Sequence, residues 1–447
     1  MRRRLRSPRV AIVDLGCAKN TVDSETALGQ LLSEEFRFTE RPQDADVVLV
    51  NTCGFIESAK QESVDHLLEA VGWKEERPDL KVVAMGCLAQ RYGQALAQDI
   101  PELDAVIGLA GACQIVDVCR RVLVGKRVHR YASTKSPSLR QGPRLLLTGQ
   151  ASAYLRIAEG CDNRCAYCAV PFIRGPYHSR AAADIVREAA ELVDRGVREL
   201  CLVAQDTTYY GAERHGRPRL AGLLRKLLRV PGAPWIRVLY AHPARVSDEL
   251  IALLGGEERL LGYLDLPIQH SETSILRRMG RGVTRRELEG LLGRLRARVP
   301  KLVVRTSLIA GFPGETDRDF ERLVEFVRAG HFEHLGAFAY SREENTRAAR
   351  MPGQIPKSEA ERRAEVLLRA QQPVTFQWLE GRVGMCETVL VEGADPQGRA
   401  VGRSRAEAPE VDGCITLNRG GFLAGARIEA CVAARNGYDL TALVQPG

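Results

Sequence analysis

The 447-residue sequence has no long apolar run, and none of its apolar stretches approaches the length of a membrane-spanning helix. Its basic start, residues 1–9, is not followed by the apolar segment of a secretory signal, since the next apolar stretch is short and contains Asp14. Twelve cysteines are too few for a disulfide scaffold in a chain of this length, so the thiols indicate metal binding in a reducing compartment. We therefore predict a cytoplasmic protein that has no membrane partner.

The residue sets typical of hydrolases are also missing, because neither a Ser-His-Asp set nor a pair of acidic residues stands where such an enzyme would need it. Apolar residues make up 45% of the chain and charged residues 27%, which are ordinary values for a soluble globular protein. The net charge of +8 permits an anionic partner without requiring one. Composition thus leaves the function open, and the cysteines carry most of the information.

A C-x3-C-x2-C motif, formed by Cys161, Cys165 and Cys168, lies in the middle of the chain after a short apolar stretch that reads as a strand. Thiolates hold iron–sulfur clusters, and a four-iron cluster with three cysteine ligands has one iron open to another ligand. A structural zinc site is an alternative, but it requires four ligands, and neither a second C-x2-C pair nor a histidine is close by. The remaining interpretation is that these three cysteines are ordinary buried or surface thiols without a metal.

A second set of three cysteines is spread over the first part of the chain. Cys17, Cys53 and Cys87 each follow a predicted strand, at intervals of 36 and 34 residues, about one strand–helix unit each. The carboxyl ends of parallel strands meet at one edge of a sheet, so the three thiols should lie together there. The sequence therefore predicts a second cluster with three ligands, the alternative being three core cysteines that merely end strands.

The central motif resembles that of the radical S-adenosylmethionine enzymes, whose signature has an aromatic residue before the last cysteine, where this chain has Tyr167. The resemblance implies a [4Fe-4S] cluster whose open iron is chelated by S-adenosylmethionine. It also implies reductive cleavage of that cofactor to an adenosyl radical, which abstracts hydrogen from an unactivated C–H bond. No catalytic side chain beyond the cluster ligands is expected, since the cofactors carry the chemistry.

The order of a three-cysteine α/β domain and a radical domain resembles the methylthiotransferases over nearly the whole chain. LGCAKN at residues 15–20, VDSE at 22–25, NTCGFI at 51–56 and QES at 61–63 are similar to the branch that modifies ribosomal protein S twelve. The tRNA-modifying branch usually has a different pair at Ala18 and Lys19. The resemblance implies methylthiolation of the β-carbon of an aspartate, two [4Fe-4S] clusters, and electron and sulfur donors of unknown identity.

Four parts are predicted along the chain. Residues 1–124 form a methylthiotransferase domain with alternating strands and helices, residues 125–151 a polar linker, residues 152–380 a radical domain with six strand–helix repeats, and residues 381–447 a tail of short strands. We therefore expect an α/β protein. It should combine a doubly wound parallel sheet, a partial (β/α)6 barrel and a small OB-like β-barrel that resembles a TRAM domain. Pro373 should kink or end the helix predicted over residues 358–378.

Polar residues follow several strands of the radical domain, where a barrel places its functional groups. By resemblance, Gln205 and Asp206 would lie near the ammonium of S-adenosylmethionine, and the backbone from Ile309 to Gly311 beside its adenine. Arg180 is a candidate partner for its carboxylate. The further residues assigned to this cofactor site are Tyr167 and Gln269. Strand-to-helix turns and ordinary ion pairs are the alternative interpretation.

The tail carries seven arginines, no lysine and eight acidic residues, a net charge of −1. A surface that tracks phosphates needs a basic stripe, so this tail suits a basic ribosomal protein better than a tRNA. The cysteines outside the two triplets, among them Cys386, Cys414 and Cys431, are predicted to be packing residues. Three hypotheses remain: a ribosomal-protein methylthiotransferase that acts as a monomer, a tRNA methylthiotransferase acting on isopentenyladenosine, and a non-catalytic iron–sulfur or redox-sensing protein.

Overall fold

The computed structural model describes residues 7–131, 142–149 and 151–445, and it divides into two compact units. The first unit comprises Met1–Leu147, Ala158–Asn163 and Cys168–His178, and the second comprises Thr148–Ile157, Arg164–Tyr167 and Ser179–Gly447. Within the described ranges, no helix is both long enough and apolar enough to cross a membrane.

The first unit contains a six-stranded parallel sheet in the order β2-β1-β3-β4-β5-β6. Its strands are β1 (Arg9–Asp14), β2 (Arg37–Phe38), β3 (Val47–Thr52), β4 (Lys81–Gly86), β5 (Ala105–Ile107) and β6 (Val128–Arg130). β3 is buried along its whole length because alternate valines and leucines pack on opposite faces of the sheet. β6 continues the sheet beyond residue 124, into the segment that the sequence analysis assigns to the linker.

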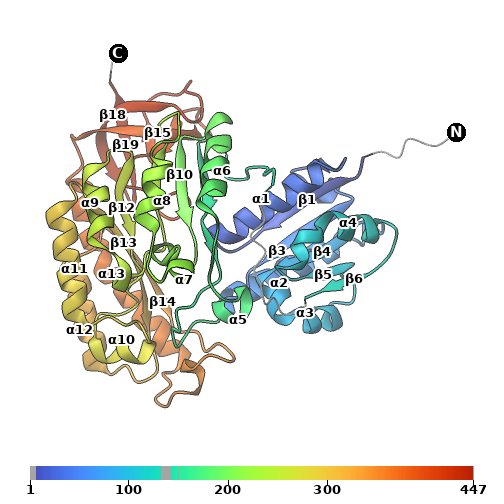
Figure 1. Ribbon diagram of the computed structural model, residues 1–447, viewed down its shortest axis with the longest axis horizontal. Helices are drawn as coiled ribbons and strands as arrows, with labels where there is room; N and C mark the ends of the chain where they lie inside the picture. Colours follow the sequence, from blue (N-terminus) through green and yellow to red (C-terminus); the bar gives the residue numbers. More distant parts are fainter. Residues whose placement is uncertain (1–6, 132–141, 150, 446–447) are drawn as a thin grey trace. The chain divides into compact units, whose positions relative to one another are not determined.

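Helices cover both faces of this sheet, as a doubly wound fold requires (Figure 1). They are α1 (Ala18–Leu32), α2 (Glu57–Gly72), α3 (Cys87–Asp99) and α4 (Ile115–Leu123). Apolar residues of α1 and α4 pack into one core, which includes Leu28 and Val118. Residues of α2 and α3, such as Leu67 and Leu96, pack into the core on the opposite face. The doubly wound sheet predicted for this part of the chain is confirmed.

The second unit contains a parallel sheet in the order β14-β13-β12-β11-β10-β7, with β7 and β14 at its edges. The strands are β7 (Ser152–Arg156), β10 (Glu199–Val203), β11 (Trp235–Val238), β12 (Leu260–Asp265), β13 (Val303–Ala310) and β14 (His334–Ala339). The longer helices that alternate with them are α6 (Ala182–Asp194), α8 (Leu220–Leu227), α9 (Asp248–Gly256), α11 (Arg285–Arg298) and α12 (Asp317–Arg328). The predicted partial (β/α)6 barrel is thus confirmed.

Helix α13 (Lys357–Glu380) runs through Pro373, so the proline does not end the helix, which was one of the two outcomes predicted for it. Side chains on both sides of the proline attach the helix to the start of β14. Gln371 donates from Nε2 to the carbonyl of Phe332 at 2.7 Å, and Thr375 donates from Oγ1 to the carbonyl of Glu333 at 2.8 Å. These tertiary bonds offset the backbone hydrogen bond that proline cannot make.

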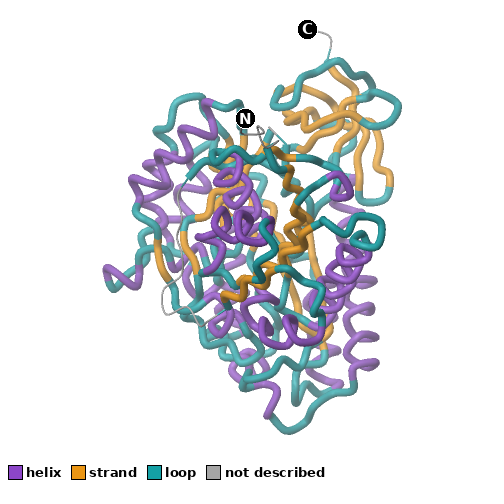
Figure 2. Tube along the Cα trace, turned by 90° about the vertical axis from the view of Figure 1, so that its right-hand side faces the viewer, coloured by secondary structure: helices purple, strands orange, loops and turns teal. Residues whose placement is uncertain are grey.

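The tail forms a closed five-stranded barrel in the order β15-β16-β17-β19-β18, drawn in orange near the C-terminal label of Figure 2. Its strands are β15 (Cys386–Ala394), β16 (Ala400–Arg403), β17 (Ile415–Leu417), β18 (Arg427–Asn436) and β19 (Asp439–Val444). Cys386 lies directly opposite Cys431 in the β15–β18 ladder, and the two form a disulfide. The prediction that both are packing residues was wrong, because a separation of 45 residues does not reveal the register of two antiparallel strands.

The tail also packs on the amino-terminal half of the partial barrel, within the same unit. Each of the six strands contributes one polar side chain that contacts residues 403–412 of the tail: Tyr154, Glu199, Arg237, Tyr263, Arg305 and His334. Glu199 accepts from Arg237 at 2.6 Å and from Arg403 at 2.7 Å, and all three side chains are buried. This end of the barrel is therefore filled by protein, and the carboxyl end remains for ligands.

Candidate active site

The cysteines of the first triplet lie where three neighbouring strands of the first unit end. Cys17 follows β1 and precedes the first residue of α1, Cys53 follows β3, and Cys87 is the first residue of α3, after β4. Gly16 has a φ of 100°, and a Cβ added there would lie 3.2 Å from Sγ of Cys53. Only glycine permits this close approach of backbone and thiol. The three loops thus converge on one edge of the sheet, as the sequence analysis predicted.

Asn20 connects all three cysteine loops and was missed as a site residue in the sequence. Its Nδ2 donates to the carbonyls of Leu15 at 2.8 Å and Thr52 at 3.2 Å, the residues that precede Gly16-Cys17 and Cys53. Its Oδ1 accepts from Sγ of Cys87 at 3.5 Å. Asn20 belongs to the LGCAKN motif, so resemblance drew attention to its neighbourhood without indicating this role.

A buried arginine, Arg174, lies beside these thiols at the end of the short helix α5 (Val170–Arg174). Its Nη2 donates to Oδ1 of Asn20 at 2.6 Å and to Oδ2 of Asp23 at 3.0 Å, and its Nη1 donates to Oε1 of Glu159 at 2.9 Å. Only 3% of its side chain is exposed. The sequence offered no periodicity or motif position that would distinguish it from an ordinary arginine.

The charges around the thiols affect each of them differently. Burial opposes ionisation of Cys17, but Lys19 and Arg174 outweigh it and lower the pKa of that thiol. Burial raises the pKa of Cys53, and it raises the pKa of Cys87 to about 12. Three thiols at one edge, with cations beside them and a glycine backbone close by, suit an anionic iron–sulfur group.

A compact site for a single ion is not present in the parts of the chain that the structure describes, where no group of three or more His, Cys, Asp or Glu side chains is arranged to hold one. Structural zinc needs four ligands within 2.3 Å of one point. Cys17, Cys53 and Cys87 converge on one edge of the sheet without forming such a site.

The C-x3-C-x2-C motif is divided between the two units, with Cys161 and Cys168 in the first and Cys165 in the second. In the first unit, the backbone N–H of Cys161 donates to the carbonyl of Gly175 at 3.1 Å. In the second unit, Nη1 of Arg281 lies 3.6 Å from Sγ of Cys165, and the Arg281 residue is 6% exposed. Arg281 is a further residue near a predicted ligand that sequence reasoning missed.

Two of the predicted cofactor residues are ion-paired in the structure. Asp206 accepts from Oγ1 of Thr208 at 2.5 Å and from Nη1 of Arg245 at 2.7 Å. Arg180 donates to the carbonyl of Arg156 at 2.7 Å and pairs with Glu188 at 2.6 Å. The Nε and Nη2 atoms of Arg180 are nevertheless buried without a hydrogen-bond partner, so this guanidinium retains donors for an anion.

The ends of β11 and β12 have backbone conformations that are rare outside glycine. Tyr240 has a φ of 57° and Gln269 a φ of 72°. The N–H of Gln269 donates to Ser307, and its carbonyl accepts from Ile309, so Gln269 continues the ladder beside β13. Such strained residues are concentrated at binding sites, and these two lie at the carboxyl end of the barrel.

The loop after β13 is fixed by a buried polar network. Glu315 accepts from the N–H of Gly311 at 3.1 Å and from Nη1 of Arg363 at 2.7 Å, and its Oε2 lies 3.5 Å from Nε2 of His270. Burial opposes ionisation of Glu315, but His270 and Arg363 outweigh it and lower the pKa of this carboxyl. A Cβ on Gly311 would lie 2.3 Å from that of Ala360, so glycine is required there.

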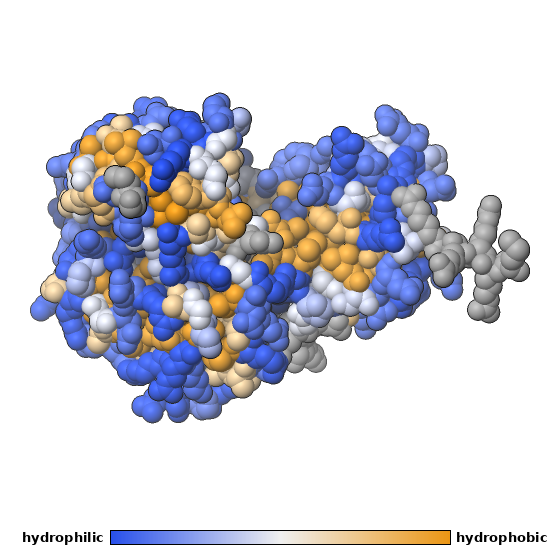
Figure 3. All heavy atoms as spheres, turned by 90° about the horizontal axis from the view of Figure 1, so that it is seen from above, coloured by the Kyte–Doolittle hydropathy of each residue, from blue (hydrophilic) through white to orange (hydrophobic). Residues whose placement is uncertain are grey.

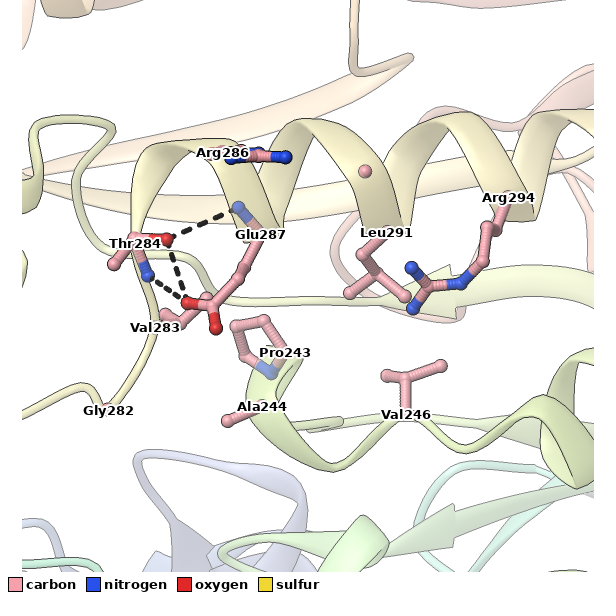
Figure 4. Close-up of a pocket in the computed structure, with 11 residues that line it drawn as sticks. Pro243, Ala244, Val246, Gly282, Val283, Thr284, Arg286, Glu287, Leu291 and Arg294 are labelled. Atoms are coloured by element: carbon pink, nitrogen blue, oxygen red, sulfur yellow. Dashed lines mark hydrogen bonds between the residues drawn. The ribbon is translucent and has the colours of Figure 1, made fainter.

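A cavity of about 620 Å³ lies between the loop after β11 and the start of α11 (Figure 4). In the close-up, Thr284 and Glu287 are joined by hydrogen bonds at the first turn of α11, and Arg294 lies further along the same helix. None of the predicted cofactor residues is among the eleven that line this cavity.

Three family matches cover most of the chain. Residues 9–108 match an uncharacterised protein family, UPF0004, residues 155–327 match the radical SAM superfamily, and residues 383–444 match the TRAM domain.

Curated relatives named ribosomal protein uS12 methylthiotransferase RimO match over nearly the full length. The protein from Acetivibrio thermocellus is 44% identical over 91% of this chain and 91% of its own. That from Desulforudis audaxviator is 44% identical over 98% and 97%. This chain belongs to the RimO family. It is a radical S-adenosylmethionine enzyme, and the resemblance stated from its motifs is confirmed. The radical SAM family implies S-adenosylmethionine and a [4Fe-4S] cluster as cofactors.

Solved structures of lower sequence similarity agree with the fold of this RimO-family enzyme. The radical S-adenosylmethionine methyltransferase TsrM from Kitasatospora setae superposes with a TM-score of 0.55 at 17% identity, covering 74% of this chain and 73% of its own. The cobalamin-dependent S-adenosylmethionine radical enzyme OxsB gives a TM-score of 0.52 at 12% identity, covering 82% and 56%. At these identities the likeness concerns the fold alone.

Proposed function

We propose that this enzyme transfers a methylthio group to the β-carbon of an aspartate in ribosomal protein uS12. The observation that carries this proposal is the nearly full-length similarity, at 40–44% identity, to proteins named ribosomal protein uS12 methylthiotransferase RimO. An aspartate β-carbon is not acidic enough for a side-chain base, which explains why radical chemistry is used. A ribosomal substrate also supports a cytoplasmic location.

Each cysteine triplet would hold one [4Fe-4S] cluster: Cys17, Cys53 and Cys87 the first, and Cys161, Cys165 and Cys168 the second. When bound, the second cluster would pass on the electron that cleaves S-adenosylmethionine, and the first would hold sulfur or a methylated sulfur at its open iron. The chain's own residues orient these groups. The convergence of three strand ends on one sheet edge supports the first assignment, and the radical SAM match over residues 155–327 supports the second.

Residues at the carboxyl end of the partial barrel would bind S-adenosylmethionine. Arg180 is the strongest candidate, because two of its donors are buried and unused and a carboxylate accepts such a pair. The N–H of Gly311 donates to Glu315, and the backbone from Ile309 to Gly311 would flank the adenine. The other proposed contacts are Tyr167, Gln205, Asp206 and Gln269.

The tail supports a protein substrate more than an RNA. Within the described residues 381–445, five of the seven arginines donate to carboxylates or backbone carbonyls: Arg382, Arg399, Arg403, Arg427 and Arg435. The same residues include six large exposed apolar side chains, of which Leu423 is the most exposed at 83%. Figure 3 shows apolar groups among charged ones on the face that it presents. A phosphate-tracking surface would require free cations instead.

Mass spectrometry on a choice of substrates tests this proposal. Anaerobically reconstituted enzyme with reductant, sulfide and S-adenosylmethionine would be offered ribosomal protein uS12 and an isopentenylated tRNA together. We expect a methylthio mass gain on one aspartate of the protein and none on the tRNA. A gain on the tRNA alone would overturn the substrate assignment, and cofactor cleavage without either product would leave the substrate open. The Cys17→Ala variant is the matched control, expected to cleave cofactor without forming product.

An electron donor and a sulfur donor are further expected partners, and we expect the enzyme to act as a monomer. Size-exclusion chromatography with light scattering tests the oligomeric state, for which a mass of 49.3 kDa is the expected result.

A further inference from the structure

The contacts of Arg174 are unusual for a buried arginine, because they join segments that carry cysteines of both triplets within one unit. On one side it donates to Asn20 and Asp23, in the helix that follows Cys17. On the other it donates to Glu159, two residues before Cys161. Arg174 itself lies six residues after Cys168, at the end of α5.

Asn20 makes the complementary connection among the three loops of the first triplet. Its amide nitrogen donates to the carbonyls of Leu15 and Thr52, and its backbone N–H donates to the carbonyl of Cys17 at 2.7 Å. Its amide oxygen accepts hydrogen bonds from both Sγ of Cys87 and Nη2 of Arg174. One side chain, 1% exposed, thereby fixes the spacing of three loops that are far apart in the sequence.

A buried cation lies close to the three thiols, where it is bonded to two carboxylates. Thiolates that hold iron are anionic, and burial makes an uncompensated negative charge costly. Arg174 is a buried guanidinium one hydrogen bond removed from a thiol, because its Nη2 donates to Oδ1 of Asn20, the atom that also accepts from Sγ of Cys87. Asp23 and Glu159 each hold one of its two terminal nitrogens, which fixes the orientation of the fork.

We propose that Asn20 and Arg174 are positioning residues of the cluster held by Cys17, Cys53 and Cys87. Asn20 sets the spacing of the three loops. Arg174 balances the charge of the thiolates and holds the segment that leads to Cys161. This inference rests on the proposed function, because it requires that the first triplet binds a cluster.

The test uses full-length protein in which Cys161, Cys165 and Cys168 are all replaced by alanine, so that only the first cluster remains. About four irons per chain are expected after anaerobic reconstitution. If this parent binds no iron, the assignment of a cluster to the first triplet fails, and the inference fails with it. If it binds iron, the remaining variants test the inference alone.

Arg174→Gln removes the charge and keeps a hydrogen-bonding side chain, whereas Arg174→Lys keeps the charge. We expect Arg174→Gln to weaken retention of iron against a chelator about tenfold, as loss of a residue behind metal ligands typically does. Its midpoint potential, from a redox titration followed by electron paramagnetic resonance, should be lower than that of the parent. Arg174→Lys should restore the potential. Equal potentials in the parent, Arg174→Gln and Arg174→Lys would overturn the role of the charge.

Asn20→Asp tests the role of Asn20 separately, since it removes the amide donors and adds a negative charge beside Cys87. We expect it to lower both the potential and the retention of iron, and unchanged values would overturn its role. Arg144→Met is the matched control, because Arg144 is also buried in this unit. Its partner Glu25 lies on α1, the helix that carries Asn20. It should lower the unfolding temperature but leave potential and iron retention unchanged. If Arg144→Met lost as much iron as Arg174→Gln, breaking any buried ion pair of this unit would weaken iron retention. That result would contradict the specific role of Arg174.

Discussion

The two ends of the partial barrel differ in how completely their buried polar groups are paired. At the amino-terminal end, Glu199 is paired with two arginines, and tail residues bind the strand side chains around it. At the carboxyl end, buried atoms lack a hydrogen-bond partner in Arg180, His270, Arg281 and Tyr340. Buried polar groups are normally satisfied, so the two unused donors of Arg180 indicate a place where a ligand can complete the structure.

Positive φ angles do not separate the two ends, because Ala233 before β11 and Lys301 before β13 also have them, at 48° and 52°. Tyr240 and Gln269, at the carboxyl ends of β11 and β12, have positive φ angles that cost free energy. The contrast that remains is between the paired Glu199 cluster at the amino end, which should serve stability, and the unused donors of Arg180 at the carboxyl end, which should serve binding. Variants at each end should affect different measurements.

The largest expected effect is at the amino end. Glu199→Gln leaves Arg237 and Arg403 buried without their carboxylate, which should lower the free energy of unfolding by about 3–5 kcal/mol. Chemical denaturation followed by circular dichroism measures this. A loss below about 1 kcal/mol would mean that the tail does not stabilise the barrel through this cluster.

Acid should act on the two ends in different pH ranges. Burial alone would raise the pKa of Glu199, but Arg237 and Arg403 outweigh it and lower the pKa to about 2. A carboxyl whose pKa is lower in the folded state contributes stability above its unfolded value, near 4.5, and loses it as the pH falls toward 2. Glu199→Gln should therefore show a decline smaller by about 3 kcal/mol between pH 4.5 and 2.

His242, beyond the carboxyl end of β11, should be sensitive in a higher range. Burial, with Arg281 and Arg245 nearby, lowers the pKa of His242 to about 2, so the folded protein keeps it neutral. The unfolded chain takes up this proton below pH 6.5, and stability should fall from that pH downward. In His242→Asn, urea unfolding between pH 6.5 and 4.5 should show a flatter decline. A decline like that of the unmodified enzyme would contradict this assignment.

At the carboxyl end, Arg180→Gln should affect cofactor binding more than stability. Removing a guanidinium that binds a carboxylate should raise the Kd for S-adenosylmethionine about tenfold or more, from loss of a charge-assisted hydrogen bond. Equilibrium dialysis with cluster-loaded enzyme measures this. Arg187→Gln, at an exposed ion pair on α6, is the control and should leave the Kd unchanged. An unchanged Kd in Arg180→Gln would remove Arg180 from the cofactor site.

The smallest effect should come from a surface pair. Glu249→Gln breaks an ion pair with Arg225 whose two side chains are about half exposed, and should change the free energy of unfolding by less than about 1 kcal/mol. Chemical denaturation beside Glu199→Gln gives the comparison directly. Similar losses in the two variants would show that burial does not determine the strength of these pairs.

The sequence predicted the features that depend on local order. Alternating strands and helices gave both sheets, and the cysteines after strands gave the shared edge of Cys17, Cys53 and Cys87, since parallel strands end on the same side. It did not predict contacts that depend on register or tertiary packing. The disulfide of Cys386 and Cys431, the continuation of α13 through Pro373 and the role of Arg174 are all of this kind.

Whether the chain holds two clusters is tested most directly by counting iron and sulfide in anaerobically reconstituted enzyme. Two four-iron clusters require about eight irons per chain. Replacement of Cys17, Cys53 and Cys87 by alanine should leave about four, and replacement of Cys161, Cys165 and Cys168 should also leave about four. About four irons in the unmodified enzyme, unchanged by loss of the first three cysteines, would contradict the two-cluster account.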